Sequence, residues 1–104
     1  MPDPTVEQML AEARAQFAAS LPGKAAALEE HLARGAWEEA RRAAHKLRGS
    51  AGSYGFVTVS GAAAEVEEAL IAVGSQADAA VLARIAEKAR EVRAEAERIA
   101  RDGT

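Results

Sequence analysis

Apolar residues recur three and four positions apart along most of this chain, the spacing that places them on one face of an α-helix. Breaks at Ser20–Gly23, Gly35, Gly55 and Gly74–Ser75 divide the chain into four helical segments, the first of them interrupted. The stripes are Val6, Leu10, Ala13 and Phe17, continued by Leu21, Ala25, Leu28 and Leu32; then Trp37, Ala40, Ala44, Leu47, Ala51 and Tyr54; then Val59, Ala63, Val66, Leu70 and Val73; and finally Leu82, Ile85, Ala89, Val92, Ala96 and Ile99. Short connections favour antiparallel neighbours, so the pattern predicts an all-α, antiparallel up-and-down four-helix bundle.

Residues that cap or break helices mark the expected boundaries. Asp3 with Pro4 can open the first helix, and Thr5 with Gln8 offers a capping box as an alternative. Pro22 has no amide hydrogen to donate, so we expect the first helix to be kinked or broken near it, with Ser20 as the cap if a new helix begins. The first helix should end at Gly35, and the second should begin near Trp37 and be ended by Gly55 and the β-branched run Val57–Val59. Thr58 or Ser60 can cap the third helix. Ser75 or Asp78 can cap the fourth, which should end near Arg101.

Composition narrows the class of protein. A length of 104 residues fits a single domain over residues 1–104, and an aromatic content of 4% suits packed helices better than a sheet. The net charge of −3 argues against a nucleic-acid partner, which would require a basic surface. The chain has no cysteine, and we find neither a signal peptide nor an apolar run of the roughly 20 residues that span a bilayer. We therefore expect a cytoplasmic protein with no membrane contact.

The apolar stripe of the helix that begins near Trp37 singles out His45. At about 100° per residue, His45 points roughly 130° away from the centre of the stripe and should face solvent. The same side carries cations and glycines one or two turns away: Arg41, Arg48, Gly49 and Gly52, with Arg42 at its margin and Lys46 further round. A glycine inside a helix costs about 1 kcal/mol relative to alanine, so we interpret this bare surface as room for a partner's backbone.

An exposed imidazole among cations suits one kind of chemistry in particular. Neutral imidazole is a nucleophile that forms covalent intermediates, and neighbouring cations can stabilise a negative group placed on it. The pattern therefore favours a histidine that accepts a phosphoryl group and passes it on. Spacing alone leaves the alternative of an ordinary surface histidine beside a fraying, glycine-rich helix end.

The segment from Ala44 to Gly55, AHKLRGSAGSYG, resembles the signature of histidine-containing phosphotransfer (HPt) domains. That signature reads His, any residue, Leu, Lys, Gly, then small residues and a further Gly. The resemblance implies a helical bundle in which His45 is the phosphoacceptor at its outer ring nitrogen and Gly49 leaves room for a docking receiver domain. Arg48 stands at the usual lysine position and would steady the phosphoryl group. Because Arg is longer and planar, this departure puts the rate of transfer in question more than the function.

The same resemblance implies partners and excludes some activities. A response-regulator receiver domain and a histidine kinase or hybrid kinase are the expected partners, with Mg²⁺ on the receiver and no cofactor or metal on this chain, which we expect to be a monomer. The expected partner-binding residues are Arg41, Arg42, Lys46, Gly49 and Gly52. The chain has no P-loop, and no strand precedes its glycines as in a dinucleotide fingerprint. We therefore expect no autonomous kinase, ATPase or phosphatase activity, although whether the chain counts as an enzyme stays open.

Three other functions remain as alternatives. The strongest is a non-catalytic helical interaction module that uses the Gly49 and Gly52 surface. A metal or haem bundle would place its ligands inward, often as Glu-x-x-His, and neither His31 nor His45 has a Glu three residues earlier. His31 is expected at the flank of the first stripe as a partly exposed structural residue. An inhibitor of a kinase dimer would need a dimer seam, which the pattern does not show.

Overall fold

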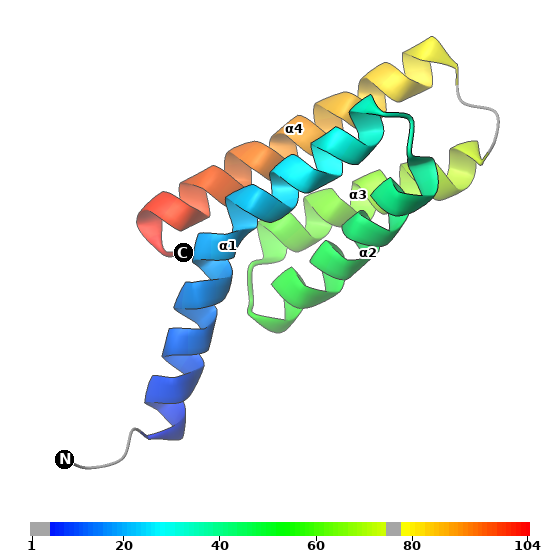
Figure 1. The fold of residues 1–104 in the computed structure, drawn as a ribbon. Helices are drawn as coiled ribbons and strands as arrows, with labels where there is room; N and C mark the ends of the chain where they lie inside the picture. The colour runs from blue at the N-terminus through cyan, green and yellow to red at the C-terminus, as the bar shows by residue number, and fades with distance from the viewer. Residues whose placement is uncertain (1–4, 75–77) are drawn as a thin grey trace.

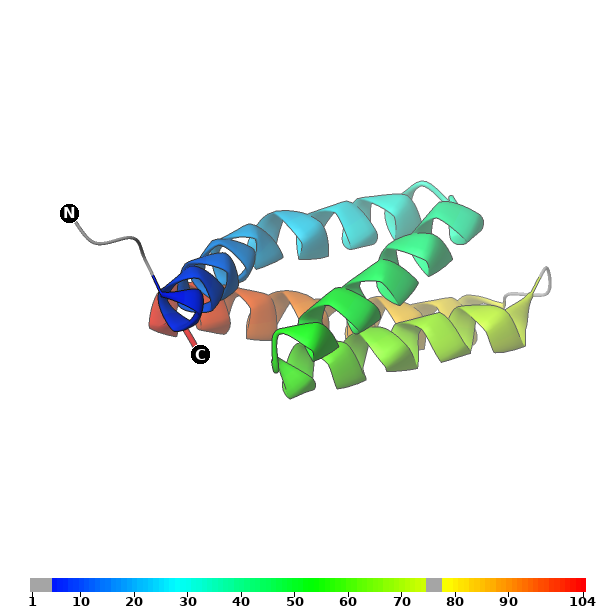
Figure 2. The ribbon, with the colours of Figure 1, turned by 90° about the horizontal axis from the view of Figure 1, so that it is seen from below.

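The computed structural model describes residues 5–74 and 78–104, which form four helices (Figure 1). They are α1 (Val6–Ala33), α2 (Trp37–Ser53), α3 (Val57–Val73) and α4 (Ala79–Asp102). Each helix packs against its neighbours in the chain, and α1 also packs against α4, which closes the bundle (Figure 2). The all-α four-helix bundle predicted from the sequence is confirmed.

The predicted capping box opens α1. Thr5 Oγ1 accepts a hydrogen bond from the Gln8 amide at 3.1 Å, and the Thr5 amide donates to Gln8 Oε1 at 2.8 Å. The alternative start at Asp3 and Pro4 lies outside the described residues. At the other end, the helix stops where Gly35 adopts a φ of 71°, as the sequence predicts.

Asp78 caps α4, one of the two residues predicted for that role. Its Oδ1 accepts a hydrogen bond from the Val81 amide at 2.9 Å. The alternative cap, Ser75, lies outside the described residues. The helix runs to Asp102, one residue past the expected end, and Gly103 then takes the left-handed conformation that commonly follows a helix.

Helix α1 continues through Pro22 and is kinked rather than broken. Proline cannot donate to the carbonyl of Ala18 one turn earlier, and its ring crowds that carbonyl. Figure 1 shows the resulting change of direction where the blue first part of α1 meets the bundle. The alternative of a new helix capped by Ser20 is not realised, because its Oγ donates to the Phe17 carbonyl at 2.6 Å within the same helix.

The turn from α2 to α3 differs from the prediction. Gly55 ends α2 with a φ of 82°, as expected. The β-branched run, however, forms the first turn of α3, and neither Thr58 nor Ser60 caps it. Phe56 occupies the cap position instead, and its ring is buried 6.0 Å from the ring of Phe17. Burial of an aromatic ring therefore decides where α3 begins, in place of a side-chain hydrogen bond.

Buried residues from all four helices form one apolar core. Most of them belong to the predicted stripes: Leu21, Ala25 and Leu28 on α1; Ala40, Ala44, Leu47 and Ala51 on α2; Val59, Ala63, Val66 and Leu70 on α3; and Ile85, Ala89, Val92, Ala96 and Ile99 on α4. Within residues 5–74 and 78–104, no helix has the length and hydropathy needed to cross a membrane. Because these stripes set the rotation of each helix, the residues opposite them are forced towards solvent.

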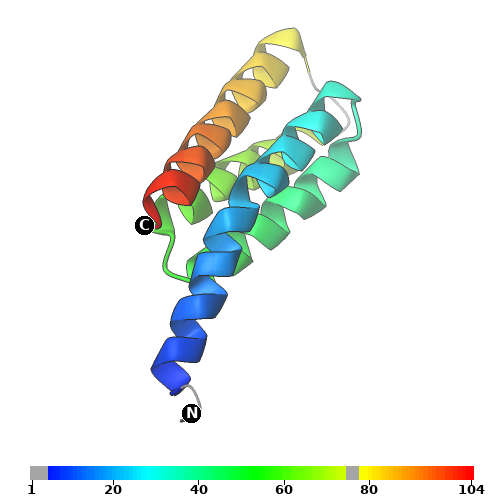
Figure 3. The same cartoon turned by 60° about the vertical axis from the view of Figure 1, so that its left-hand side comes forward.

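The prediction that the start of α1 faces the core is wrong. Val6 and Leu10 are 71% and 62% exposed, and Figure 3 shows this end of α1 projecting beyond the other helices. Helix α1 has 28 residues and α2 has 17. At 1.5 Å per residue, α1 is therefore about 16 Å longer than its neighbour. Periodicity identifies the apolar face of a helix, but the lengths of the neighbours decide how much of that face is covered.

We predict that two matched leucine truncations on α1 differ strongly in their effect on stability. Leu28→Ala should lower the free energy of unfolding by about 2–5 kcal/mol, because the side chain is fully buried and its removal leaves a cavity. Leu10→Ala should change it by no more than about 0.5 kcal/mol, because Leu10 is already exposed. Urea unfolding of both variants at neutral pH measures the difference, and equal losses would show that the start of α1 is packed in solution.

Candidate functional site

His45 lies near the middle of α2 and faces solvent, as the sequence predicts. Its side chain is 70% exposed, whereas its neighbours Ala44 and Leu47 are buried in the core. These buried neighbours fix the rotation of α2, so the imidazole is held at the surface. His31, the second histidine, is half-buried on α1, in agreement with its predicted structural role.

Glu67 on α3 belongs to the site and was not identified from the sequence. Among residues 5–74 and 78–104 it is the only buried charged residue, with 5% of its surface exposed. Its Oε2 lies 2.6 Å from His45 Nδ1, and its Oε1 accepts a hydrogen bond from Arg48 Nη1 at 3.2 Å. A signal was present in the sequence: Glu67 follows Ala63 by four positions and precedes Leu70 by three. A charge at the edge of an apolar stripe needs a partner from another helix.

The protonation state of Glu67 determines the tautomer of His45. Burial raises the pKa of the Glu67 carboxyl, but hydrogen bonds from Arg48 and His45 outweigh burial and hold this pKa below its ordinary value. Glu67 is therefore ionised at neutral pH, and a carboxylate can only accept hydrogen bonds. The proton in the short contact belongs to His45 Nδ1. In the neutral ring, this tautomer leaves the nucleophilic lone pair on Nε2, at the exposed side of the imidazole.

Arg48 brings a positive charge to the same place. It lies one turn after His45 on α2, and its side chain is nearly half exposed. Besides its bond to Glu67, Arg48 Nη1 lies 3.8 Å from Glu68 Oε1. A guanidinium has five N–H donors, so Arg48 retains donors for a further anion while it holds Glu67.

Arg41 and Arg42 are both held by Glu38, near the start of α2. Arg41 donates to the two Glu38 oxygens at 3.0 and 2.7 Å, and Arg42 Nε lies 3.3 Å from Glu38 Oε1. The hydrogen bond from Arg41 lowers the pKa of Glu38, and the same bond raises the pKa of Arg41. The predicted cationic flank is therefore present, but a carboxylate that was not considered from the sequence partly neutralises it.

Lys46 lies on a different side of α2 from the His45–Glu67 pair. It lines a groove of about 220 Å³ together with Lys24 of α1. The groove runs between α1 and α2, whereas His45 and Glu67 meet between α2 and α3. The structure therefore separates Lys46 from the arginines, as its angle around the helix predicts.

The glycines Gly49 and Gly52 are both exposed but have different surroundings. A Cβ atom added at Gly49 would meet nothing within 4 Å, so this position is open to a partner. A Cβ atom added at Gly52 would lie 3.2 Å from Ser60 Oγ on α3. The missing side chain at Gly52 therefore accommodates a neighbouring helix within the bundle.

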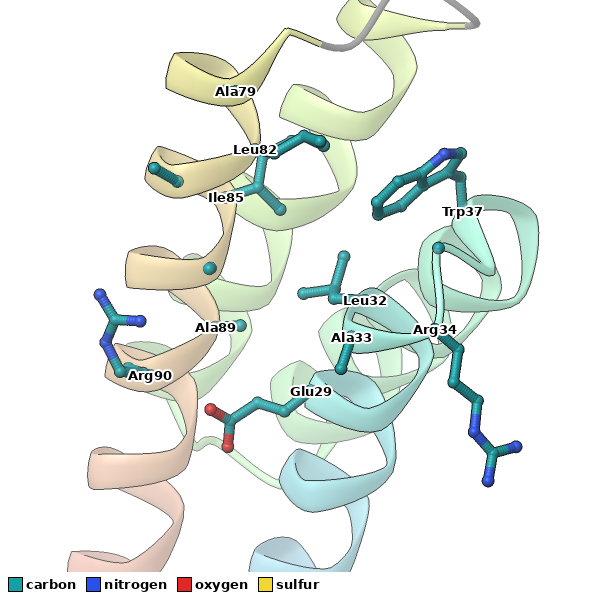
Figure 4. Close-up of a pocket in the computed structure, with 13 residues that line it drawn as sticks. Glu29, Leu32, Ala33, Arg34, Trp37, Ala79, Leu82, Ile85, Ala89 and Arg90 are labelled. Carbon is teal, nitrogen blue, oxygen red and sulfur yellow. The ribbon is translucent and has the colours of Figure 1, made fainter.

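An apolar cleft of about 890 Å³ opens where the end of α1 and the start of α2 face α4 (Figure 4). Trp37 and Leu82 line it, and its carboxylate Glu29 is paired with Arg93 at 3.2 Å. No histidine lines this cleft, so the nucleophilic chemistry lies outside it. In the part of the chain that the structure describes, no three His, Cys, Asp or Glu side chains gather as a metal site would require.

A family model described as the Hpt domain matches residues 12–102 of the chain. The match includes α2, α3 and the whole His45–Glu67–Arg48 cluster. Comparisons with curated proteins and with solved structures gave no match. The family model confirms the resemblance that the residues around His45 indicate. The chain belongs to the Hpt domain family, whose members serve phosphotransfer in two-component signalling and interact with receiver domains and kinases.

Proposed function

We propose that this chain is a phosphorelay intermediate. His45 accepts a phosphoryl group from a receiver-domain aspartate or a kinase and passes it to a receiver-domain aspartate. The 2.6 Å contact between His45 Nδ1 and Glu67 Oε2 is the observation that carries this function, because it leaves the Nε2 lone pair available on a side chain that is 70% exposed. In this proposal the chain acts as a cytoplasmic monomer through one domain over residues 1–104.

Transfer to His45 requires no proton to leave the ring. The Nε2 lone pair forms a bond to phosphorus while the bond from phosphorus to the aspartate oxygen breaks, and the aspartate leaves as a carboxylate. The imidazole keeps its Nδ1 proton and becomes positively charged. Glu67 lies in place to stabilise that charge, as the buried carboxylate of a hydrolase triad does for its histidine. The reverse step returns the phosphoryl group to a receiver domain.

The rest of the chemistry belongs to positioning and to the partner. Arg48 would donate to the phosphoryl oxygens with N–H groups that Glu67 does not use. Mg²⁺ is expected on the partner receiver domain, and in this proposal the chain holds no cofactor. We also propose that the chain has no autonomous kinase, ATPase or phosphatase activity. Its contribution is an oriented nucleophile, which is mainly an effect of proximity and alignment.

The surface around His45 would receive the partner. Gly49 leaves a strip of helix backbone uncovered, which allows close approach, whereas the bare backbone at Gly52 is faced by Ser60 of α3. Arg41 and Arg42 bring positive charge to the His45 side of α2, and Lys46 brings it to another side; such charge steers and orients a partner more than it tightens binding. The receiver domain would therefore cover the strip while its aspartate faces Nε2.

We predict that His45→Gln abolishes phosphate uptake without unfolding the bundle, because His45 is exposed and Gln is not a nucleophile. The measurement is incubation with a phosphorylated receiver domain, followed by a search for acid-labile, alkali-stable phosphate on this chain. His31→Gln is the matched control and should accept phosphate at the wild-type rate.

The same variants separate phosphotransfer from the rival function of a non-catalytic interaction module using the Gly49 and Gly52 surface. A pure binder carrying His45→Gln would keep its affinity and would never have carried phosphate in the wild type. Phosphate uptake by His45→Gln equal to that of the wild type would assign the site to another residue.

We predict that Glu67→Gln slows transfer by about 10- to 100-fold, by analogy with metal-binding histidines that lose the hydrogen-bond partner that orients the ring. The stability of the variant should also depend less on acid pH than that of the wild type. The lowered pKa of Glu67 means that its charge stabilises the fold above the unfolded-state value near 4.5, and that this stability is lost as pH falls through the folded-state pKa. Unfolding by urea from pH 7 down to pH 3 measures the difference.

A matched control for this charge is Glu65→Gln, at an exposed glutamate on the same helix. It should retain transfer and the acid sensitivity of the wild type. If Glu67→Gln showed the same pH dependence of stability as the wild type, the carboxylate would not be the charged partner of His45 and Arg48.

We predict that Gly49→Leu impairs docking while leaving the fold intact. A Cβ atom at position 49 meets nothing within 4 Å, and leucine is a better helix former than glycine. The free energy of unfolding should therefore stay equal or rise by up to about 1 kcal/mol. Transfer from a phosphorylated receiver should slow by at least about tenfold, because a leucine would hold the partner's backbone away from His45.

Gly61→Leu is the control for this change. Gly61 also has an open Cβ position, but it lines a groove between α3 and α4. Transfer should survive that substitution. If Gly49→Leu accepted phosphate at the wild-type rate, Gly49 would have no role in letting the partner approach His45 closely.

A further inference from the structure

Helices α2 and α3 also meet at a polar contact outside the cluster of His45, Arg48 and the glutamates of α3. Ser60 Oγ on α3 donates to the backbone carbonyl of Arg48 on α2 at 2.8 Å. The same hydroxyl would lie 3.2 Å from a Cβ atom at Gly52. Within a helix, the Arg48 carbonyl already faces the amide of residue 52, so Ser60 uses its second lone pair. A Cβ atom at position 52 would force this hydroxyl to shift by a few tenths of an ångström, whereas a glycine leaves its place open.

The facing positions Gly52 and Ser60 lie as far from His45 and Glu67 on one helix as on the other. Gly52 follows His45 by seven residues on α2, and Ser60 precedes Glu67 by seven residues on α3. Because the helices run antiparallel and seven residues span about 10 Å, one register satisfies both contacts. A shift of α3 by one residue would move Glu67 by about 1.5 Å along the helix, which is enough to break a hydrogen bond of normal length.

We propose that Gly52 and Ser60 form a register lock, with Ser60 as a positioning residue for His45. The lock holds α3 against α2 at the offset at which the Glu67 carboxylate meets His45 Nδ1. It acts through backbone and hydroxyl groups and touches neither the imidazole nor a partner. Its effect on transfer rests on the function proposed above, whereas its effect on the imidazole does not.

The free protein provides the first test. In Gly52→Ala, the added methyl group pushes Ser60 Oγ away from the Arg48 carbonyl, so the ¹⁵N and Nδ1-proton NMR signals of His45 should shift towards those of a ring without its carboxylate partner. Ser60→Ala should cause the same shift, because it removes the donor. The control is Gly49→Ala, which adds the same methyl group to the same helix where nothing lies within 4 Å, and it should leave the His45 signals unchanged.

The double variant Gly52→Ala with Ser60→Ala distinguishes the lock from general damage. Once the hydroxyl is absent, the methyl group at position 52 no longer has its closest contact. The double variant should therefore resemble Ser60→Ala in its NMR signals and transfer rate, with no added loss. In transfer from a phosphorylated receiver, each single variant should be slower by about tenfold, comparable to the loss of an orienting hydrogen bond.

Two results would overturn the lock. One is that the His45 NMR signals of Gly52→Ala and Ser60→Ala are those of the wild type. The other is that the double variant loses as much transfer rate as the two single variants combined. If the wild-type protein accepted no phosphate at all, the phosphorelay function would fail, and the NMR comparison would still decide whether the lock exists.

Discussion

The hydrogen bond between the Glu67 carboxylate and the His45 imidazole is the interaction on which the rest of the site depends. A carboxylate buried between two helices is unfavourable unless it is paired and hydrogen-bonded, and here its partners are His45 and Arg48. The contact that makes Glu67 tolerable in the interface also orients the imidazole and leaves Nε2 exposed. His45 therefore helps Arg48 to pair this buried carboxylate, and the nucleophile gains its geometry from the bundle.

A periodic pattern of apolar residues identifies some parts of this site and not others. The buried residues of α2, such as Ala44 and Leu47, set the rotation of the helix, so the exposure of His45 could be derived from spacing alone. The role of Glu67 could not. Pairing across helices depends on their register, and the stripe of a single helix carries no information about register. Glu38 is a different case, because it lies three and four residues before Arg41 and Arg42 on the same helix, a spacing that indicates such pairs from the sequence.

Two errors in the fold have related causes. The stripe at the start of α1 is genuine, but Val6 and Leu10 project past the end of the shorter α2, and periodicity says nothing about the length of a neighbour. Thr58 and Ser60 are good capping residues by type, yet burial of Phe56 against Phe17 sets the start of α3. Burying an aromatic ring outweighs a capping bond, which is worth about 1 kcal/mol. Ser60 is then free to bond across to α2.

The glycines near the end of α2 differ in whether a contact within the molecule explains them. Gly55 takes a left-handed conformation that turns the chain and brings Phe56 into the core, and Gly52 admits Ser60 to the Arg48 carbonyl. Each therefore has a reason within the molecule that offsets the cost of a glycine. Gly49 has no such contact, although it costs about as much as any other glycine inside a helix. Gly61 on α3 is equally open, so an uncovered glycine does not by itself indicate a partner. Gly49 differs because it lies one turn after His45, where a partner that approaches the imidazole would offset its cost.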